Sequence, residues 1–133
     1  MEKVTKEVVG GVFCREGKVL IMRRAPFLSW AGWWEFPGGK QEKGESHEAC
    51  LARELKEELG IDARIGEFLT ENSHGYDFGT VHLSIYEVTD WDGEISLVVH
   101  DDMRWVPLRE LADFPNLLPA DIPVAHALEK IFA

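Results

Sequence analysis

The chain has 133 residues, of which 45% are hydrophobic and 29% charged, and this composition suits one folded domain with a core. A formal net charge of −10 argues against a surface for a nucleic-acid polymer, which would need a basic patch. Because the sequence has neither a long apolar run nor a signal-peptide pattern, it predicts a cytoplasmic protein with no membrane partner. Its two cysteines, Cys14 and Cys50, are interpreted as reduced core residues.

The first part of the sequence predicts a β-hairpin followed by a loop. Residues 3–13 alternate loosely and are rich in valine, which favours a strand. After a turn at 15–18, residues 19–23 are expected to form the second strand. Residues 25–34 contain Pro, Ser and Gly and are expected to form a loop, with its three tryptophans interpreted as packing groups.

The clearest helix is predicted between Ser46 and Gly60. Serine is a favoured N-cap, glycine is a favoured C-terminal stop, and the residues between them are mostly good helix formers without Pro or Gly. At about 100° per residue, one stripe of this helix is apolar. That stripe carries Leu51, Ala52, Leu55 and Leu59.

The neighbouring stripe of the same helix is acidic. Glu54, Glu57 and Glu58 have the spacing i, i+3, i+4, and Arg53 flanks them. Like charges at this spacing repel, whereas Mg²⁺ takes oxygen ligands and often binds through carboxylates together with substrate phosphates. The pattern favours a metal–phosphate site, and the alternative is a solvated acidic face balanced by Arg53 and Lys56.

The second half predicts further strands and a terminal helix. Strands are expected at 64–71, 80–89, 94–99 and 103–107, with a turn at 92–93. One helical turn is expected at 108–112 and an amphipathic helix at 121–132. The order is a mixed α/β layout without repeats or a linker, so residues 1–133 are expected to form a single domain.

Residues 39–61 read G-x5-E-x7-R-E-L-x-E-E-x-G-I and match the signature of the Nudix hydrolases at every defining position. The resemblance extends over nearly the whole chain and is closest to the MutT-like branch. It includes E-F-P-G-G-K at 35–40, W-D-G-E at 91–94, Trp105, Phe114-Pro115 and the segment 119–123. The resemblance implies the Nudix fold, an α/β/α sandwich with a mixed sheet, and a Nudix box at 39–61.

The resemblance also implies an activity. MutT-like enzymes use Mg²⁺, with Mn²⁺ as a substitute, to cleave a nucleoside triphosphate into the monophosphate and diphosphate in nucleotide-pool housecleaning. By this resemblance Glu54, Glu57 and Glu58 are metal ligands, and the carbonyl of Gly38 completes the coordination. Either Glu54 or Glu57 is expected to take the proton of the attacking water.

Two further box residues are assigned a supporting role by the same resemblance. Arg53 is expected to pair with and orient a glutamate, either Glu45 or Glu57. Glu45 and Arg53 therefore belong to the expected catalytic set.

The chain departs from its relatives in one loop. Relatives often place a glutamate six residues before the tryptophan that is Trp105 here, and this chain has Val99 at that position. Either Asp101 or Asp102 stands in for that glutamate by a small shift, or the role is absent here.

Asp121 bears on the choice of base, since it falls where MutT-like enzymes place a base-reading residue. That residue is Asn in the branch that selects 8-oxo-guanine nucleotides. An ionised Asp can only accept hydrogen bonds, and its natural partner is the exocyclic amine of cytosine or adenine. This favours a cytosine-type or modified nucleotide, although Asp121 is equally placed to cap the last helix.

Four other residues are expected to contact the nucleotide, each with a structural alternative. Arg24 corresponds to a nucleotide-contacting arginine of MutT-like relatives, or it is a surface charge. Phe36, Tyr76 and Phe78 are expected to wall the base, or to belong to the core.

Three other functions stay open. They are an 8-oxo-dGTP diphosphatase in mutation avoidance, a hydrolase of ADP-ribose or dinucleotides, and a non-catalytic nucleotide-binding module. The expected partner is a nucleoside triphosphate, and the expected assembly is a monomer or homodimer.

Overall fold

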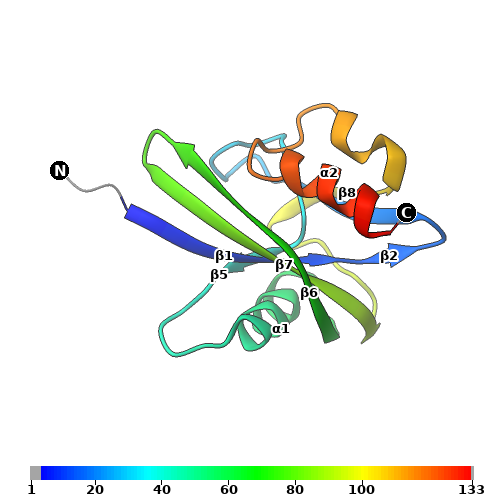
Figure 1. The fold of residues 1–133 in the computed structure, drawn as a ribbon. Coiled ribbons are helices and arrows are strands. Elements are labelled where there is room, and N and C mark those ends of the chain that lie inside the picture. The colour runs from blue at the N-terminus through cyan, green and yellow to red at the C-terminus, as the bar shows by residue number, and fades with distance from the viewer. Residues whose placement is uncertain (1–3, 133) are drawn as a thin grey trace.

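The structure is a computed structural model that describes residues 4–132, and Figure 1 shows its arrangement. The elements in chain order are β1 (Val4–Val12), β2 (Cys14–Arg15), β3 (Lys18–Arg24), β4 (Trp34–Glu35), β5 (Gly38–Lys40), α1 (His47–Leu59), β6 (Asp62–Tyr76), β7 (Gly79–Asp92), β8 (His100–Pro107), the 3₁₀ helix η1 (Leu108–Asp113) and α2 (Ile122–Ile131). Lys3, at the start of the first predicted strand, lies outside the described residues.

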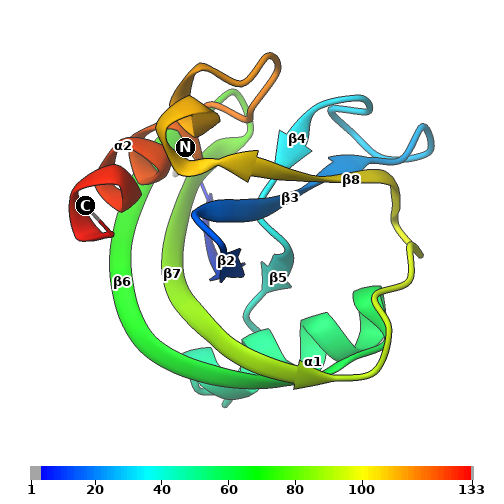
Figure 2. The ribbon, with the colours of Figure 1, turned by 90° about the vertical axis from the view of Figure 1, so that its right-hand side faces the viewer.

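The strands form two sheets. The first has the order β5-β1-β7-β6 and is mixed, because β1 runs parallel to β7 while the other pairs are antiparallel. The second is antiparallel and centres on β3, which pairs with β2 and β4 on one edge and with β8 on the other. Figure 2 shows β6 and β7 as a long curved pair that reaches from α1 to α2.

The core consists of two apolar clusters on opposite sides of the strands. Side chains that alternate along a strand point to opposite faces, and in β3 Val19 and Ile21 join the cluster next to α2 while Leu20 and Met22 join the cluster next to α1. The strands are thus covered by a helix on each side (Figure 1), and the expected α/β/α arrangement with a mixed sheet is confirmed.

Helix α1 begins and ends where the sequence predicts. The Ser46 hydroxyl accepts a hydrogen bond from the backbone N–H of Ala49, and Gly60 adopts the left-handed conformation at the C-terminus with φ of 73°. The apolar stripe is buried through Leu51, Leu55 and Leu59, and the neighbouring acidic stripe is therefore held at the edge of that contact.

The strand predicted at 94–99 is wrong, because this segment is a loop before β8. The backbone N–H and the hydroxyl of Ser96 both donate to the carbonyl of Leu59, at 2.9 and 3.1 Å. The segment therefore satisfies the carbonyl at the end of α1 instead of pairing with a strand. Of the apolar residues that suggested a strand, Leu97 and Val98 are exposed.

The pairing register of β3 and β8 shifts at the C-terminal end of β3. Arg23 pairs with Asp102 and Arg24 pairs with His100, so Asp101 is an extra residue in a β-bulge. Bulges often redirect side chains next to active sites, and here the bulge sets His100 opposite Arg24.

No helix within residues 4–132 is long and apolar enough to cross a membrane.

Candidate active site

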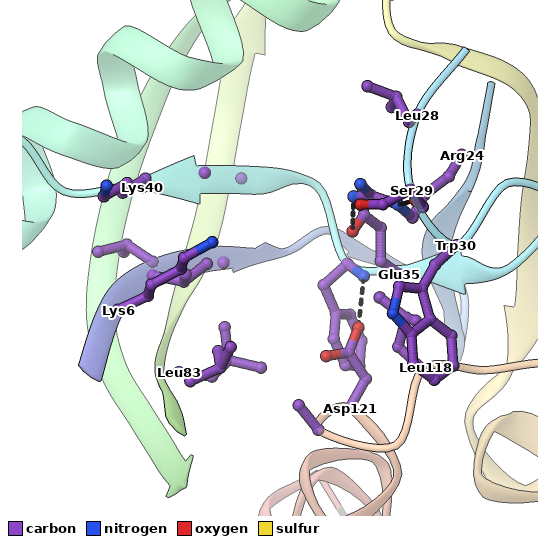
Figure 3. A pocket seen from close by; sticks show the side chains of 18 of the residues that line it. Lys6, Arg24, Leu28, Ser29, Trp30, Glu35, Lys40, Leu83, Leu118 and Asp121 are labelled. Carbon is purple, nitrogen blue, oxygen red and sulfur yellow. Dashed lines mark hydrogen bonds and ion pairs between the residues drawn. The ribbon is translucent and has the colours of Figure 1, made fainter. Parts of the chain in front are cut away.

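A cavity of about 410 Å³ opens between β1, β5, the end of α1 and the segment before α2. Its volume is in the range of small-molecule sites. Figure 3 shows its wall, with Arg24, Glu35 and Trp30 on one side, Lys6 and Lys40 on another, and Asp121 at the end of the segment that enters α2. Of the expected site residues, the wall contains Arg24, Phe36, Gly38, Glu58, Tyr76, Phe78 and Asp121.

One end of the cavity is aromatic. Tyr76 and Phe78 stack with their ring centroids 5.5 Å apart and their planes 4° apart, and Trp30 meets Tyr76 edge-on at 5.6 Å. The Nζ atom of Lys6 lies 4.4 Å from the centroid of the Phe78 ring. Phe36 is 5% exposed, lines the cavity and also packs in the α2-side core.

Asp121 is buried in this end of the cavity and does not cap α2. Its side chain makes no cap bond, and its Oδ2 instead accepts the backbone N–H of Phe36 at 3.1 Å. Burial, and then the negative charge of Glu35, raises the pKa of Asp121 well above its usual range. The raised pKa makes the neutral form more accessible than in an exposed aspartate, and a neutral carboxylic acid can donate as well as accept, unlike the ionised form assumed from the sequence.

Arg53 forms hydrogen bonds with three glutamates of the Nudix box. Its Nε and Nη2 donate to the two carboxylate oxygens of Glu45 at 2.6 and 3.0 Å, and its Nη1 lies 3.0 Å from Glu54 and 3.2 Å from Glu57. Of the two partners expected for Arg53, Glu45 has the bidentate contact and Glu57 a single one. This pairing lowers the pKa of Glu45 to about 2, so Glu45 stays ionised and fixes the guanidinium.

The other glutamates of the box differ in exposure. Glu58 lines the cavity, and burial followed by the nearby charges of Glu54 and Glu35 raises its pKa to about 8. Burial also raises the pKa of Glu54, in spite of its hydrogen bond from Arg53. Glu57 is 59% exposed at its side chain and lies outside the cavity wall.

The carboxylates suit a hard divalent cation, although they do not yet converge on one point. Within residues 4–132, no three His, Cys, Asp or Glu side chains stand in an arrangement that already holds a metal ion. Glu54 and Glu57 are instead both hydrogen-bonded to Nη1 of Arg53. The donors are nevertheless all oxygens, and the raised pKa values of Glu54 and Glu58 mark buried, mutually repelling acids that a cation would stabilise.

The loop that departs from the resemblance contributes backbone but no acid to the cavity. Val99 lines the cavity, and its carbonyl accepts the backbone N–H of Ala25. The carboxylate of Asp101 accepts Arg23 Nε at 2.7 Å, while Asp102 accepts the backbone N–H of Met103. Neither aspartate lines the cavity, so the structure gives no support to a substitution for the missing glutamate.

One aromatic and three charged residues of the wall were not predicted from the sequence. Trp30 was interpreted as loop packing, yet it lines the cavity and touches Tyr76. Lys6, Glu35 and Lys40 also line the cavity without having been assigned a role. Glu35 and Lys40 stand at the two ends of E-F-P-G-G-K, and that stretch was the available signal. For Lys6 there was none, because its position follows only from the pairing of β1 with β7.

Comparisons with known proteins agree with this architecture. The NUDIX domain family matches residues 4–128. The chain is 39% identical over 127 residues to the CTP pyrophosphohydrolase of Escherichia coli (strain K12), covering 96% of this chain and 93% of that protein. It is 37% identical over 97 residues to the 8-oxo-dGTP diphosphatase of Proteus vulgaris, covering 72% of this chain and 87% of that protein. The solution structure of the E. coli ORF135 protein matches with a TM-score of 0.87 and 37% identity, covering 98% of this chain and 93% of that one.

Proposed function

This chain belongs to the NUDIX family, and from that premise we propose that it hydrolyses nucleoside triphosphates to the monophosphate and diphosphate in nucleotide-pool housecleaning. One observation carries the proposal. A single cavity joins the acidic end of α1, through Glu58, to an aromatic end that holds a buried hydrogen-bonding group, Asp121. Such a cavity has room for phosphates at one end and a base at the other.

The box residues divide the work at the phosphate end. Glu54, Glu57 and Glu58, with the Gly38 carbonyl, would hold Mg²⁺ or Mn²⁺, which supplies charge neutralisation of the phosphates and activation of a water. Glu54 or Glu57 would accept a proton from the attacking water. Arg53 holds these carboxylates in place through its bidentate contact with Glu45.

Residues of the aromatic end bind the nucleoside. Tyr76, Phe78 and Phe36 offer flat apolar surface for a base, and stacking of a base on an aromatic ring is worth about 1–3 kcal/mol. Arg24 offers a cation beside them. A cytosine-type triphosphate is the preferred substrate of this proposal, and the relative named as a CTP pyrophosphohydrolase supports that choice.

A second substrate class is favoured by the raised pKa of Asp121. A neutral carboxylic acid can accept from N4–H of cytosine and donate to N3, but it can also accept from N7–H of an 8-oxo-purine and donate to O6. The 8-oxo-dGTP diphosphatase relatives fit this second class.

The cytoplasm, where Cys14 and Cys50 would stay reduced, is the proposed location.

Glu57→Gln tests the catalytic proposal. The change keeps the size of the side chain and removes its charge, so we expect kcat to fall by at least about 100-fold, in line with the loss of a proton-transfer group or metal ligand. The measurement is release of diphosphate from a triphosphate with Mg²⁺. Glu48→Gln, an exposed acid in the first turn of the same helix, serves as the matched control and should retain full activity. Equal activity of both variants would contradict the proposed role of Glu57, whereas a wild-type protein that releases no diphosphate would leave the non-catalytic alternative.

Asp121→Asn tests the choice of base. Wild-type protein and variant are compared by kcat/KM on CTP, dCTP, 5-methyl-dCTP, dGTP and 8-oxo-dGTP. The proposal expects wild type to prefer the cytosine set and the variant to shift toward 8-oxo-dGTP by about tenfold, the effect of one altered hydrogen bond of roughly 1.4 kcal/mol. A wild-type preference for 8-oxo-dGTP would establish the second class instead.

A further inference from the structure

A chain of hydrogen bonds leads from a buried histidine to the wall of the cavity. The side chain of His100 is fully buried, and its Nε2 lies 2.9 Å from Oε2 of Glu35. The other oxygen, Oε1, accepts Arg24 Nη1 at 2.9 Å. Because an ionised carboxylate only accepts, the Nε2 atom of His100 carries the proton that it donates to Glu35.

The other nitrogen of this ring indicates that His100 is not there for packing. Its Nδ1 is buried, and no polar group in the described part of the chain bonds to it. A buried polar atom without a partner is destabilising, so an apolar side chain would fill this space at lower free energy. What the histidine contributes is the Nε2–H bond to Glu35.

Arg24 connects Glu35 to the loop before β4 by hydrogen bonds to both. Its Nε donates to the carbonyl of Ser29 at 2.7 Å, and Figure 3 shows this contact together with the one to Glu35. The next residue, Trp30, lines the cavity and has a φ of 56°, a backbone conformation that a bulky side chain adopts only when its surroundings hold it. Two of the five N–H donors of Arg24 are used in these bonds, and Arg24 itself lines the cavity.

We propose that His100 and Glu35 are positioning residues that hold Arg24, and through Ser29 the Trp30 loop, in the conformation that binds the nucleotide. The bulge at Arg23/Arg24 serves this arrangement, because it sets His100 opposite Arg24 at the end of β8. The inference rests on the proposed function for the identity of the ligand. The positioning itself is a property of the free protein.

His100→Phe removes the donor and the unpartnered nitrogen while keeping a planar ring. We expect the melting temperature to stay equal or rise, while KM for the preferred triphosphate rises about tenfold and kcat changes much less. His100→Gln keeps an N–H near the position of Nε2, so it should restore most of the lost affinity. Arg104→Gln, an exposed change on the same strand, is the control and should leave both constants unchanged.

A readout without turnover separates this inference from the proposed function. In the ¹H–¹⁵N spectrum, the Nε–H signal of Arg24 should exchange slowly with solvent in wild type and in His100→Gln, and rapidly in His100→Phe. If wild type hydrolyses no triphosphate but this pattern holds, the function fails and the positioning stands. If wild type is active and His100→Phe lowers the melting temperature with KM unchanged, the positioning is overturned.

Glu35→Gln gives an independent route should His100→Phe fail to fold. The amide keeps the shape of Glu35 but cannot accept from both His100 and Arg24 through two oxygens. KM should rise by a similar factor, and the double variant should be no worse than either single one, since both act through one chain of contacts. Fully additive effects on KM would overturn the inference.

Discussion

At the scale of single residues, Gly38 and Gly39 bring backbone into places where no side chain fits. A Cβ on Gly38 would collide with the backbone of Val9, and a Cβ on Gly39 would collide with the carboxyl group of Glu54. Gly38 also has a φ of 155°, which disfavours other residues. Gly38 therefore lets β5 lie directly against β1, and Gly39 lets β5 lie directly against Glu54 of α1.

Gly39→Ala should displace the Glu54 carboxylate from its place beside β5. We expect weaker binding of Mn²⁺, together with a loss of only about 1 kcal/mol or less in the free energy of unfolding, because the end of the flexible Glu54 side chain can move aside. Urea denaturation and metal titration by calorimetry measure the two effects. Gly75→Ala is the matched control, because a Cβ there meets nothing within 4 Å, and it should change stability by less than about 0.5 kcal/mol. Equal effects of the two changes would contradict this account of Gly39.

At the scale of elements, the sequence predicted what local signals specify. Helix α1 was found at its correct ends because Ser46 and Gly60 are read from the chain itself. The two-residue strands β2 and β4 are too short to leave a periodic pattern, and they exist only because β3 lies beside them. The hydrogen bond from Phe36 to Asp121 joins two segments 85 positions apart, so no local rule could replace the expected helix cap with it.

Three strands of the mixed sheet are also joined by one histidine. His82 of β7 lies 2.6 Å from the carboxylate of Glu7 on β1 and 2.8 Å from that of Glu71 on β6. The hydrogen bonds to Glu7 and then Glu71 raise the pKa of His82 above its usual value. The folded protein therefore binds a proton here more tightly than the unfolded chain does.

The stabilisation by His82 should vanish in alkali. It is fully present below the unfolded pKa of about 6.5 and is lost as pH rises through the raised folded value. Melting temperatures of wild type and His82→Gln, compared from pH 6 to pH 9, should differ at the acid end and converge at the alkaline end. Both carboxylates are about half exposed, so the difference should stay below about 1 kcal/mol per pair and shrink in salt. A gap that widens with pH would refute this account.

At the scale of the whole molecule, β3 makes the two sides of the sandwich interdependent. Its successive side chains pack alternately in the α2-side and α1-side clusters. Both clusters therefore need β3 to be complete. The turn at 15–18 predicted a second hairpin strand here, but the sequence did not predict that both faces of this strand would be buried. That depends on α1 and α2, which come from later parts of the chain and pack on opposite faces of the strands.

Leu55→Ala should weaken the whole fold and not α1 alone. Leu55 is fully buried in the α1-side cluster, and a cavity of this kind costs about 2–5 kcal/mol. Fluorescence and far-UV circular dichroism should report one shared unfolding transition at a lower urea concentration. Leu97→Ala, on an exposed leucine, should leave the transition in place. Separate transitions for the two probes would show that the clusters unfold independently.

The parallel pairing of β1 with β7 has a consequence for the order in which the chain can fold. Val4 pairs with Gly79 and Val12 with Glu87, whereas the earlier partner β5 covers only three residues of β1. During synthesis the first strand therefore leaves the ribosome long before its main neighbour exists, and contacts this distant in sequence form slowly. A valine-rich strand that stays unpaired during synthesis can pair with other chains. Expression yield at high temperature should accordingly respond more to added charge in the solvent-facing positions of β1 than to equal changes in β6, which meets β7 as soon as their hairpin is made.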